Sequence, residues 1–130
     1  MQQGDPNDAF VAFDHVQKSY DGVSLVVKDL NLSIAKGEFL TMLGPSGSGK
    51  TTTLMMLGGF EQPTSGRILL EGQAVERLPP ERRDIGFVFQ NYALFPHMTV
   101  AENVGFPLRY RGIRGAEAAR RTIEALAMVK

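Results

Sequence analysis

Apolar and polar residues alternate along two segments near the start of the chain, residues 10–20 (FVAFDHVQKSY) and 25–34 (LVVKDLNLSI). Asp21-Gly22, between the two segments, is a turn signal. A period of two residues is typical of a strand with one exposed face, so the pattern predicts two strands joined by a turn. The candidates for the buried face of the first strand are Phe10, Ala12 and either Phe13 or Val16.

Three shorter apolar segments are also predicted to be strands. Residues 38–43 (EFLTML) form a nearly continuous apolar run, as expected for a buried parallel strand. Residues 67–72 (RILLEG) and 85–90 (IGFVFQ) follow turn signals at residues 63–66 and at Pro79-Pro80. The first two-thirds of the chain is therefore predicted to be rich in strands.

Two segments carry helical signals. A helix is predicted from about Gly49 to Gly58-Gly59, because paired glycines can end a helix. Residues 115–129 (GAEAARRTIEALAMV) space their apolar side chains at helical intervals, and basic residues outnumber acidic ones beyond Tyr110, which favours a basic solvated face. The charged residues 81–84 (ERRD) are expected to form a solvated turn.

Composition restricts the classes of protein. The 130 residues are 43% hydrophobic, with 14 basic and 14 acidic side chains, so no overall charge favours a nucleic-acid partner. The absence of cysteine excludes disulfides, zinc-thiolate sites and cysteine nucleophiles. The start of the chain has no secretory signal pattern, and no apolar run reaches the roughly 18 residues that span a bilayer. We therefore expect a soluble, cytoplasmic chain whose membrane association depends on a partner.

The residues GPSGSGKT (44–51) match the phosphate-binding pattern G-x-x-x-x-G-K-[ST], between a predicted strand and a predicted helix. Glycine accepts positive φ and lets backbone N–H groups approach phosphate oxygens, and those groups lie at a helix N-terminus that favours an anion. Lys50 is predicted to reach the β- and γ-phosphates, Thr51 to offer its hydroxyl to Mg²⁺, and Thr52 to bond the α-phosphate. The predicted phosphate-binding residues are Gly44, Pro45, Ser46, Gly47, Ser48, Gly49, Lys50, Thr51 and Thr52. A guanine-specific enzyme is disfavoured, because no Asn-Lys-x-Asp motif occurs.

Together with GPSGSGKTT, the segments KSYDG (18–22) and FVFQNYALFPHMTVAENV (87–104) resemble the ATP-binding subunits of ABC transporters. The resemblance runs from about Phe10 to the end of the chain and is greatest to the subunits of polyamine, iron and sugar importers. It implies an α/β fold with a P-loop NTPase (RecA-like) core, an antiparallel β subdomain and a helical subdomain. The implied organisation is a flexible tail at 1–9, the β subdomain and P-loop core at 10–90, and the start of the helical subdomain at 91–130.

The resemblance also implies roles for individual residues. Tyr20 matches the aromatic residue that stacks on adenine, and Gln90 matches the glutamine that contacts Mg²⁺ and orients the attacking water, so Lys50 and Gln90 are the catalytic candidates. The implied cofactors are ATP and Mg²⁺. The residues implied to contact a membrane permease are Tyr92, Leu94, Phe95 and Met98.

The resemblance implies further partners and a location. They are a second ATPase subunit in a homodimer, the transmembrane permease and, indirectly, a solute-binding protein, with no nucleic acid. The subunit is expected at the cytoplasmic face of the membrane, and polyamine is the solute favoured by residues 87–110.

The sequence departs from the family pattern in one respect. It contains no LSGGQ signature, no apolar run ending in Asp-Glu (Walker B) and no later switch histidine. Because phosphoryl transfer depends on positioning and charge stabilisation, these 130 residues are expected to bind nucleotide weakly and not to hydrolyse it. Two alternatives stay open: a soluble ABC-type ATPase without a permease, and a nucleotide-binding fragment with no catalytic duty.

Overall fold

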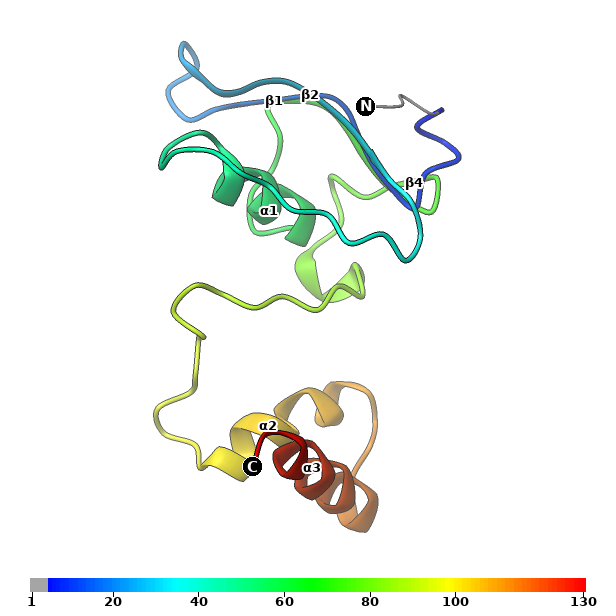
Figure 1. Ribbon diagram of the computed structural model, residues 1–130, viewed down its shortest axis with the longest axis vertical. Helices are drawn as coiled ribbons and strands as arrows, with labels where there is room; N and C mark the ends of the chain where they lie inside the picture. Colours follow the sequence, from blue (N-terminus) through cyan, green and yellow to red (C-terminus); the bar gives the residue numbers. More distant parts are fainter. Residues whose placement is uncertain (1–4) are drawn as a thin grey trace. The chain divides into compact units, whose positions relative to one another are not determined.

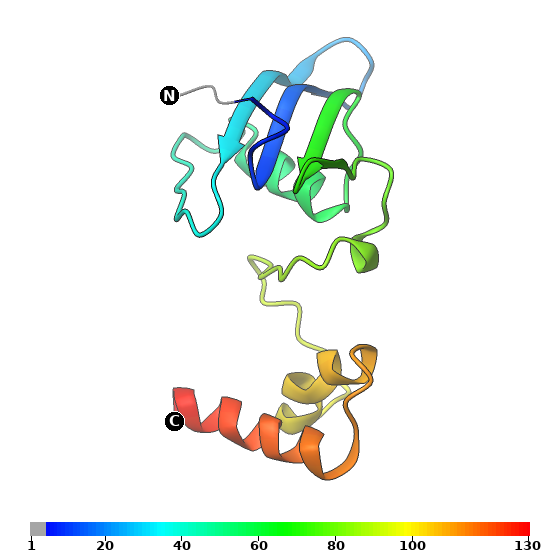
Figure 2. The same cartoon turned by 90° about the vertical axis from the view of Figure 1, so that its right-hand side faces the viewer.

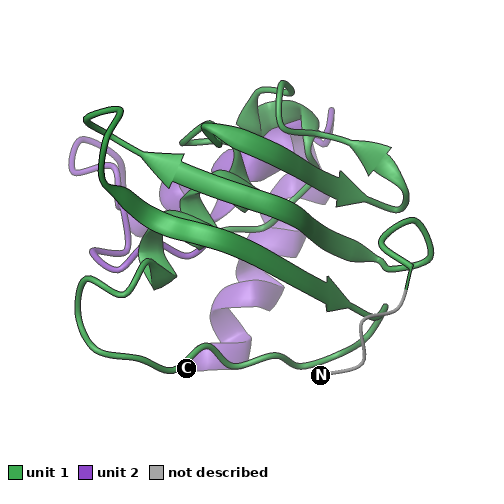
Figure 3. Ribbon diagram, turned by 90° about the horizontal axis from the view of Figure 1, so that it is seen from above, with its two compact units in different colours: residues 1–87 green, residues 88–130 purple. Residues whose placement is uncertain are grey.

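The computed structural model describes residues 5–130, so part of the predicted tail at 1–9 lies outside the described residues. The chain forms two compact units, distinguished by colour in Figure 3. The first unit ends at Phe87, and the second comprises Val88–Lys130.

The first unit contains a four-stranded antiparallel sheet in the order β2-β1-β3-β4. The strands are β1 (Val11–Ser19), β2 (Leu25–Ile34), β3 (Ser65–Leu70) and β4 (Gln73–Ala74). Figure 2 shows β1, in dark blue, between β2, in cyan, and β3, in green. The predicted strands at 10–20, 25–34 and 67–72 are therefore confirmed as β1, β2 and β3, with small shifts at their ends.

A bulge in β1 decides which of its side chains are buried. His15 has a positive φ of 48°, and the pairing with β2 shifts between Phe13 and Val16. Phe13 and Val16 are consequently both buried, whereas strict alternation allowed only one of them. Phe10 was expected to face inwards but is 36% exposed, because it precedes the strand.

The core of the first unit lies between the sheet and helix α1 (Lys50–Gly58), which packs on one face of the sheet (Figure 1). Met56 of α1 is fully buried against side chains from β1 and β3, including Val16 and Ile68. The predicted helix from Gly49 to Gly58-Gly59 is thus confirmed. Its C-cap, Gly59, has a left-handed φ of 86° that glycine adopts without strain.

Arg83 was expected in a solvated turn, but it is 5% exposed and holds the C-terminal end of α1. Its guanidinium donates to the carbonyl oxygens of Met56 (2.8 Å) and Leu57 (3.0 Å), and to that of Leu78 (2.9 Å). A cation at this end of a helix satisfies carbonyls that lack an intrahelical partner. Burial lowers the pKa of Arg83. The expectation of a solvated turn is wrong at Arg83, because two of its three hydrogen-bond partners, Met56 and Leu57, are distant in sequence.

Two predicted strands are absent from the part of the chain that the structure describes. Residues 38–43 and 85–90 have no regular secondary structure. A strand requires a neighbour that pairs with its N–H and C=O groups, and neither segment has such a neighbour among the described strands. Phe39 (94% exposed) and Leu43 (92% exposed) therefore have no apolar cover within this unit.

The second unit contains helices α2 (Val100–Tyr110) and α3 (Gly115–Val129). α3 confirms the predicted helix at 115–129, and its surface carries two ion pairs at i, i+4 spacing, Arg120–Glu124 and Arg121–Glu117. α2 was not predicted, although Thr99 and Glu102 form a capping box that was visible in the sequence. None of the helices in residues 5–130 has the length and apolar character needed to cross a membrane.

Asp21 organises the turn between β1 and β2. One carboxylate oxygen accepts hydrogen bonds from the backbone N–H groups of Val23 (2.8 Å) and Ser24 (2.7 Å) and from the Ser19 hydroxyl (3.0 Å). The bonds from Val23 and Ser24 stabilise the ionised form and lower the pKa of Asp21 from 3.8 to about 2.

This carboxylate makes the stability of the turn dependent on pH. Its contribution is complete above pH 3.8 and is lost as the pH falls through about 2, because the unfolded chain binds the proton first. We expect an NMR titration of the Asp21 side-chain carbon to report a midpoint near 2. Asp21→Asn should remove this titration and keep an oxygen acceptor for the turn. A midpoint at the ordinary value would contradict the hydrogen-bonded turn.

Candidate functional site

The candidate site is the loop at residues 44–49, which leads directly into α1. Gly47 (φ 81°) and Gly49 (φ 92°) both adopt left-handed backbone conformations that favour glycine. Gly49 is also the N-cap of α1, and a Cβ there would lie 3.1 Å from the carbonyl oxygen of Val26 in β2. Glycine at position 49 therefore allows the chain to turn into α1 and allows the start of α1 to lie close to β2.

Lys50 folds back over this loop. Its ammonium donates to the carbonyl oxygen of Gly44, to that of Pro45 (2.7 Å) and to the hydroxyl of Ser48 (3.1 Å). The positive charge is consequently held within the loop rather than extended into solvent. An anion bound there would meet the charge without a large movement of the side chain.

The N-terminus of α1 is arranged to receive an anion. Within the described chain, no side chain caps this end of the helix, and its first turn contains no acidic residue. The first N–H groups of a helix have no intrahelical partner and carry the positive end of the helix dipole. Thr53 anchors the turn, because its N–H (2.9 Å) and its hydroxyl (2.8 Å) both donate to the Gly49 carbonyl.

The oxygen ligands offered at this site fit Mg²⁺ only when phosphate supplies further ligands. Thr51 is exposed and offers one hydroxyl oxygen, the hard type of ligand that Mg²⁺ prefers. In residues 5–130 no group of three His, Cys, Asp or Glu side chains is placed to hold a metal ion. Because Mg²⁺ is commonly held by one or two protein ligands together with phosphates and water, this donor set fits a metal–nucleotide complex.

Tyr20 follows the last residue of β1 and is 60% exposed. The ammonium of Lys18 lies 4.8 Å from the centre of its ring. The tyrosine thus presents an exposed aromatic surface in the same unit as the loop. Stacking of this ring on adenine stays a prediction.

The other predicted site residues belong to the second unit. Gln90 is exposed and lies in a turn rather than at the end of a strand. Tyr92 (77%) and Leu94 (71%) are largely exposed, whereas Phe95 is 37% exposed and packs on Phe106, with ring centres 4.6 Å apart. Met98 is half-buried. The catalytic role of Gln90 and the permease-contact role of the apolar residues stay predictions.

Asn103 organises the 95–99 segment and was missed by sequence reasoning. Its amide oxygen accepts from the N–H of Phe95 (2.8 Å), and its amide nitrogen donates to the carbonyls of Phe95 (3.2 Å), Met98 (3.2 Å) and Thr99 (2.9 Å). A lone asparagine inside a helix carries no sequence signal for this role. It fixes the backbone that bears Phe95 and Met98 against α2.

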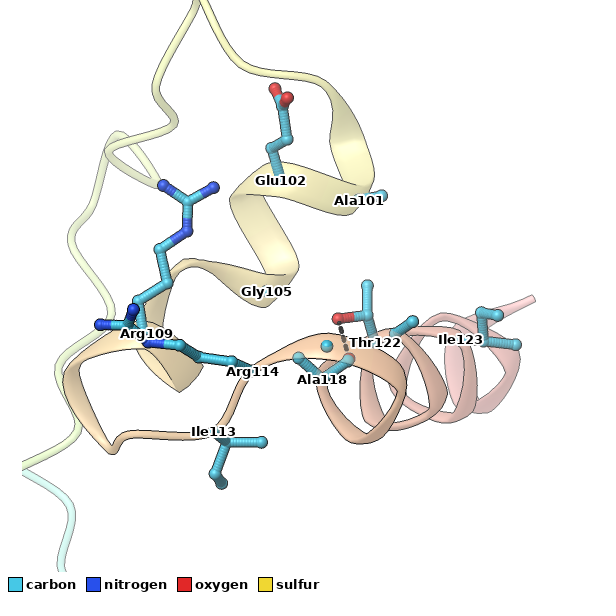
Figure 4. Close-up of a pocket in the computed structure, with 11 residues that line it drawn as sticks. Ala101, Glu102, Gly105, Arg109, Ile113, Arg114, Ala118, Thr122 and Ile123 are labelled. Carbon is cyan, nitrogen blue, oxygen red and sulfur yellow. Dashed lines mark hydrogen bonds between the residues drawn. The ribbon is translucent and has the colours of Figure 1, made fainter.

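The second unit also contains a hollow of about 690 Å³ between α2 and α3 (Figure 4). Its lining includes the small residues Gly105, Gly115, Ala118 and Ala119, with Arg109 and Arg114. The Thr122 hydroxyl at this surface donates to the Ala118 carbonyl of its own helix (2.8 Å). Of the motifs found in the sequence, only the end of the 87–104 segment reaches this hollow, through Ala101 and Glu102.

A glycine-rich loop that holds a lysine ammonium at the uncapped start of a helix defines the class of P-loop phosphate-binding proteins. Residues 27–130 match the family model described as ABC transporter. The chain belongs to this family, which confirms the resemblance stated from its motifs.

The relatives in this family include importer ATPases. Over 130 residues the chain is 48% identical to the spermidine/putrescine import ATP-binding protein PotA of Aggregatibacter actinomycetemcomitans, covering all of the chain and 35% of that protein. It is 52% identical over 124 residues to the protein of the same name from Acidothermus cellulolyticus, covering 95% of the chain and 32% of the relative. The chain therefore spans about a third of the length of the curated relatives it matches.

A solved structure shares the fold. The dimeric, post-hydrolysis structure of the ATP-binding cassette MJ0796 bound to ADP and Pi matches with a TM-score of 0.82 and 37% identity, over 91% of this chain and 56% of that one. The mixed α/β fold with an antiparallel sheet is thus that of an ATP-binding cassette.

Proposed function

We propose that this chain is the nucleotide-binding part of an ABC ATPase subunit that couples ATP hydrolysis to the import of a polyamine such as spermidine or putrescine. The observation that carries the proposal is the placement of the Lys50 ammonium among the loop carbonyls at the uncapped N-terminus of α1. The importer relatives support the transport role and the choice of solute. The proposed complete fold adds a parallel RecA-like core to the antiparallel subdomain, with residues 91–130 beginning a helical subdomain.

The loop accounts for recognition of the phosphates. Backbone N–H groups between Pro45 and Thr52 would donate to phosphate oxygens, and Lys50 would transfer its donors from the loop oxygens to the β- and γ-phosphates. The hydroxyls of Ser46 and Ser48 lie on the same exposed loop and add donors. Mg²⁺, held by Thr51 and Gln90 together with the phosphates, would supply charge neutralisation at the transferred group.

Adenine and water are assigned to other residues. Tyr20 would stack on the adenine ring, a contact worth about 1 kcal/mol by comparison with aromatic pairs. Gln90 would orient the water for attack on the γ-phosphorus. The signature and Walker B residues needed for turnover are not among these 130 residues, so the proposed role of this part of the protein is binding.

The proposed complete assembly is a homodimer of ATPase subunits on the cytoplasmic face of a membrane, bound to transmembrane permease subunits. A solute-binding protein would deliver the polyamine to the permease. The exposed apolar side chains Tyr92 and Leu94, beside Phe95 and Met98, are the proposed permease contact. The strong exposure of Tyr92 and Leu94 supports this choice, since a contact surface must be accessible.

Uptake measurements in the host organism test the transport role. We expect disruption of the gene to abolish uptake of labelled spermidine and putrescine, because transport without ATP hydrolysis stops. Uptake of labelled maltose and of chelated iron should be unchanged. Loss of sugar or iron uptake instead would show that the proposed solute is wrong. No change in any uptake, with no permease recovered by affinity purification, would favour a soluble ABC-type ATPase.

A further inference from the structure

Lys18 is a charged residue of β1 that the proposed function does not use. Its side chain is only 13% exposed, which is low for a lysine. Its ammonium contacts the carboxylate of Glu61 (3.2 Å), the carbonyl oxygen of Gln62 (2.8 Å) and, at 4.8 Å from the ring centre, the face of Tyr20. The three contacts hold the cation in one place, with the aromatic ring beside it.

Hydrogen bonds of the backbone groups on both sides of Lys18 connect the end of β1 to the segment that follows α1. The N–H of Thr64 donates to the carbonyl of Gln17 (2.8 Å), and the N–H of Ser19 donates to the hydroxyl of Thr64 (2.9 Å). Residues 61–64 lie between the C-cap of α1, at Gly59, and the start of β3. The helix that begins at the phosphate loop therefore leads into the segment that holds Lys18.

The Tyr20 ring has few other restraints. It is 60% exposed, and among the ring contacts found in the described residues the Lys18 ammonium is its only partner. A cation over a ring is attracted to the negative face of the π-system and occupies that face. The opposite face is then the one available to a flat ligand.

We infer that Lys18 is a positioning residue for nucleotide binding, which fixes the Tyr20 ring from one side so that its other side receives the adenine of ATP. This inference rests on the proposed ATP-binding function and on adenine stacking by Tyr20. Its physical basis is preorganisation: a ring that is already ordered loses less conformational freedom when the base stacks on it. Lys18 is assigned no contact with the nucleotide itself.

A comparison of ATP with inorganic tripolyphosphate separates positioning of the Tyr20 ring from a direct effect of the Lys18 charge on phosphate binding. Lys18→Met keeps an apolar stem of similar length and removes the ammonium. We expect it to weaken the binding of ATP to the full chain by roughly two- to tenfold, the range set by one immobilised side chain and one cation–π contact. Binding of inorganic tripolyphosphate, which has no base to stack, should be unchanged.

A double-mutant cycle with Tyr20→Ala supplies the decisive readout. If Lys18 acts through the ring, Lys18→Met has no further effect on ATP binding once Tyr20 has been replaced. Lys18→Arg keeps a cation and should restore most of the lost affinity. Lys28→Met, at an exposed position of β2, is the matched control and should bind both ligands as the wild type does.

The outcomes are distinguishable. A Tyr20→Ala variant that binds ATP as tightly as the wild type overturns adenine stacking, and this inference with it. A Tyr20→Ala variant that binds ATP more weakly, combined with an unaffected Lys18→Met or with an equal loss in the Tyr20→Ala background, overturns the role of Lys18 alone. If Lys18→Met melts below the assay temperature, Glu61→Gln gives a second test, because it removes one of the three contacts that hold the ammonium. It should weaken ATP binding less than Lys18→Met would and leave tripolyphosphate binding unchanged, and an unaffected ATP affinity would count against the role of Lys18.

Discussion

We expect the replacement of Lys50 with methionine to abolish detectable ATP binding by this chain while leaving its fold intact. The ammonium is the only charged donor that the structure places in the loop, where it lies among the oxygens of Gly44, Pro45 and Ser48. Hydrogen bonds to charged groups contribute about 1.5–3 kcal/mol each, so loss of two phosphate contacts weakens binding by roughly 100-fold or more. Isothermal titration with Mg²⁺-ATP measures the change.

The matched control for this substitution is Lys36→Met, in the exposed turn after β2. This substitution removes one positive charge elsewhere in the first unit, so the variant should bind ATP like the wild type. The melting temperatures of both variants should lie within a few degrees of that of the wild type. Equal affinities of wild type and Lys50→Met would exclude the loop as the phosphate site.

ATP hydrolysis is tested separately. We expect phosphate release by the wild-type chain to be no faster than by a Lys50→Ala variant.

Replacing Gly66 with alanine is the substitution expected to destabilise the first unit most. Asp14 pairs with Arg67 and Gln17 with Ser65, so Gly66 faces the bulge formed by His15 and Val16. A Cβ at Gly66 would lie 2.3 Å from the His15 carbonyl oxygen and 2.6 Å from the Val16 Cα. Since both contacts are to backbone, rotation of a side chain cannot relieve them, and β3 would have to separate from β1.

We expect Gly66→Ala to lower the free energy of unfolding by about 3 kcal/mol or more, the sum of backbone strain at a φ of 88° and overpacking. Urea denaturation followed by circular dichroism measures this change. Gly22→Ala is the matched control, because Gly22 has a similar φ of 79° with no atom within 4 Å of the added Cβ. It should cost about 1 kcal/mol, from strain alone. Equal effects of the two substitutions would show that the bulge leaves room for a Cβ at position 66.

Helices, strands and loops whose structure depends on residues close in sequence could be predicted from the sequence. The alternation at 25–34 and the helical spacing at 115–129 coincide with β2 and α3. The phosphate loop could be predicted because its chemistry lies within one short segment: the glycines that take positive φ, the lysine and the start of the helix are adjacent in sequence. The capping box at Thr99 and Glu102 was equally local, and α2 could have been predicted from it.

Features that depend on residues distant in sequence could not be predicted. The bulge at His15 is matched by Gly66, the buried Arg83 serves carbonyls 26 and 27 residues earlier, and Lys18 is held by Glu61 and Gln62. In each case the side chain alone suggests a solvated charge or an ordinary strand residue. Only its distant partner shows where it lies and what it holds.

By itself, the sequence determined three of the four strands of the antiparallel sheet (β1, β2 and β3), the helix that follows the phosphate loop, and the family to which the chain belongs. The tertiary structure decided that both Phe13 and Val16 are buried, that Arg83 holds the end of α1, and that residues 38–43 are not a strand despite their apolar pattern. The physical reason is the range of the interactions. Turns, caps and helical periodicity are set by residues a few positions apart, whereas a strand or a buried charge is stable only when a partner from elsewhere in the chain completes its hydrogen bonds.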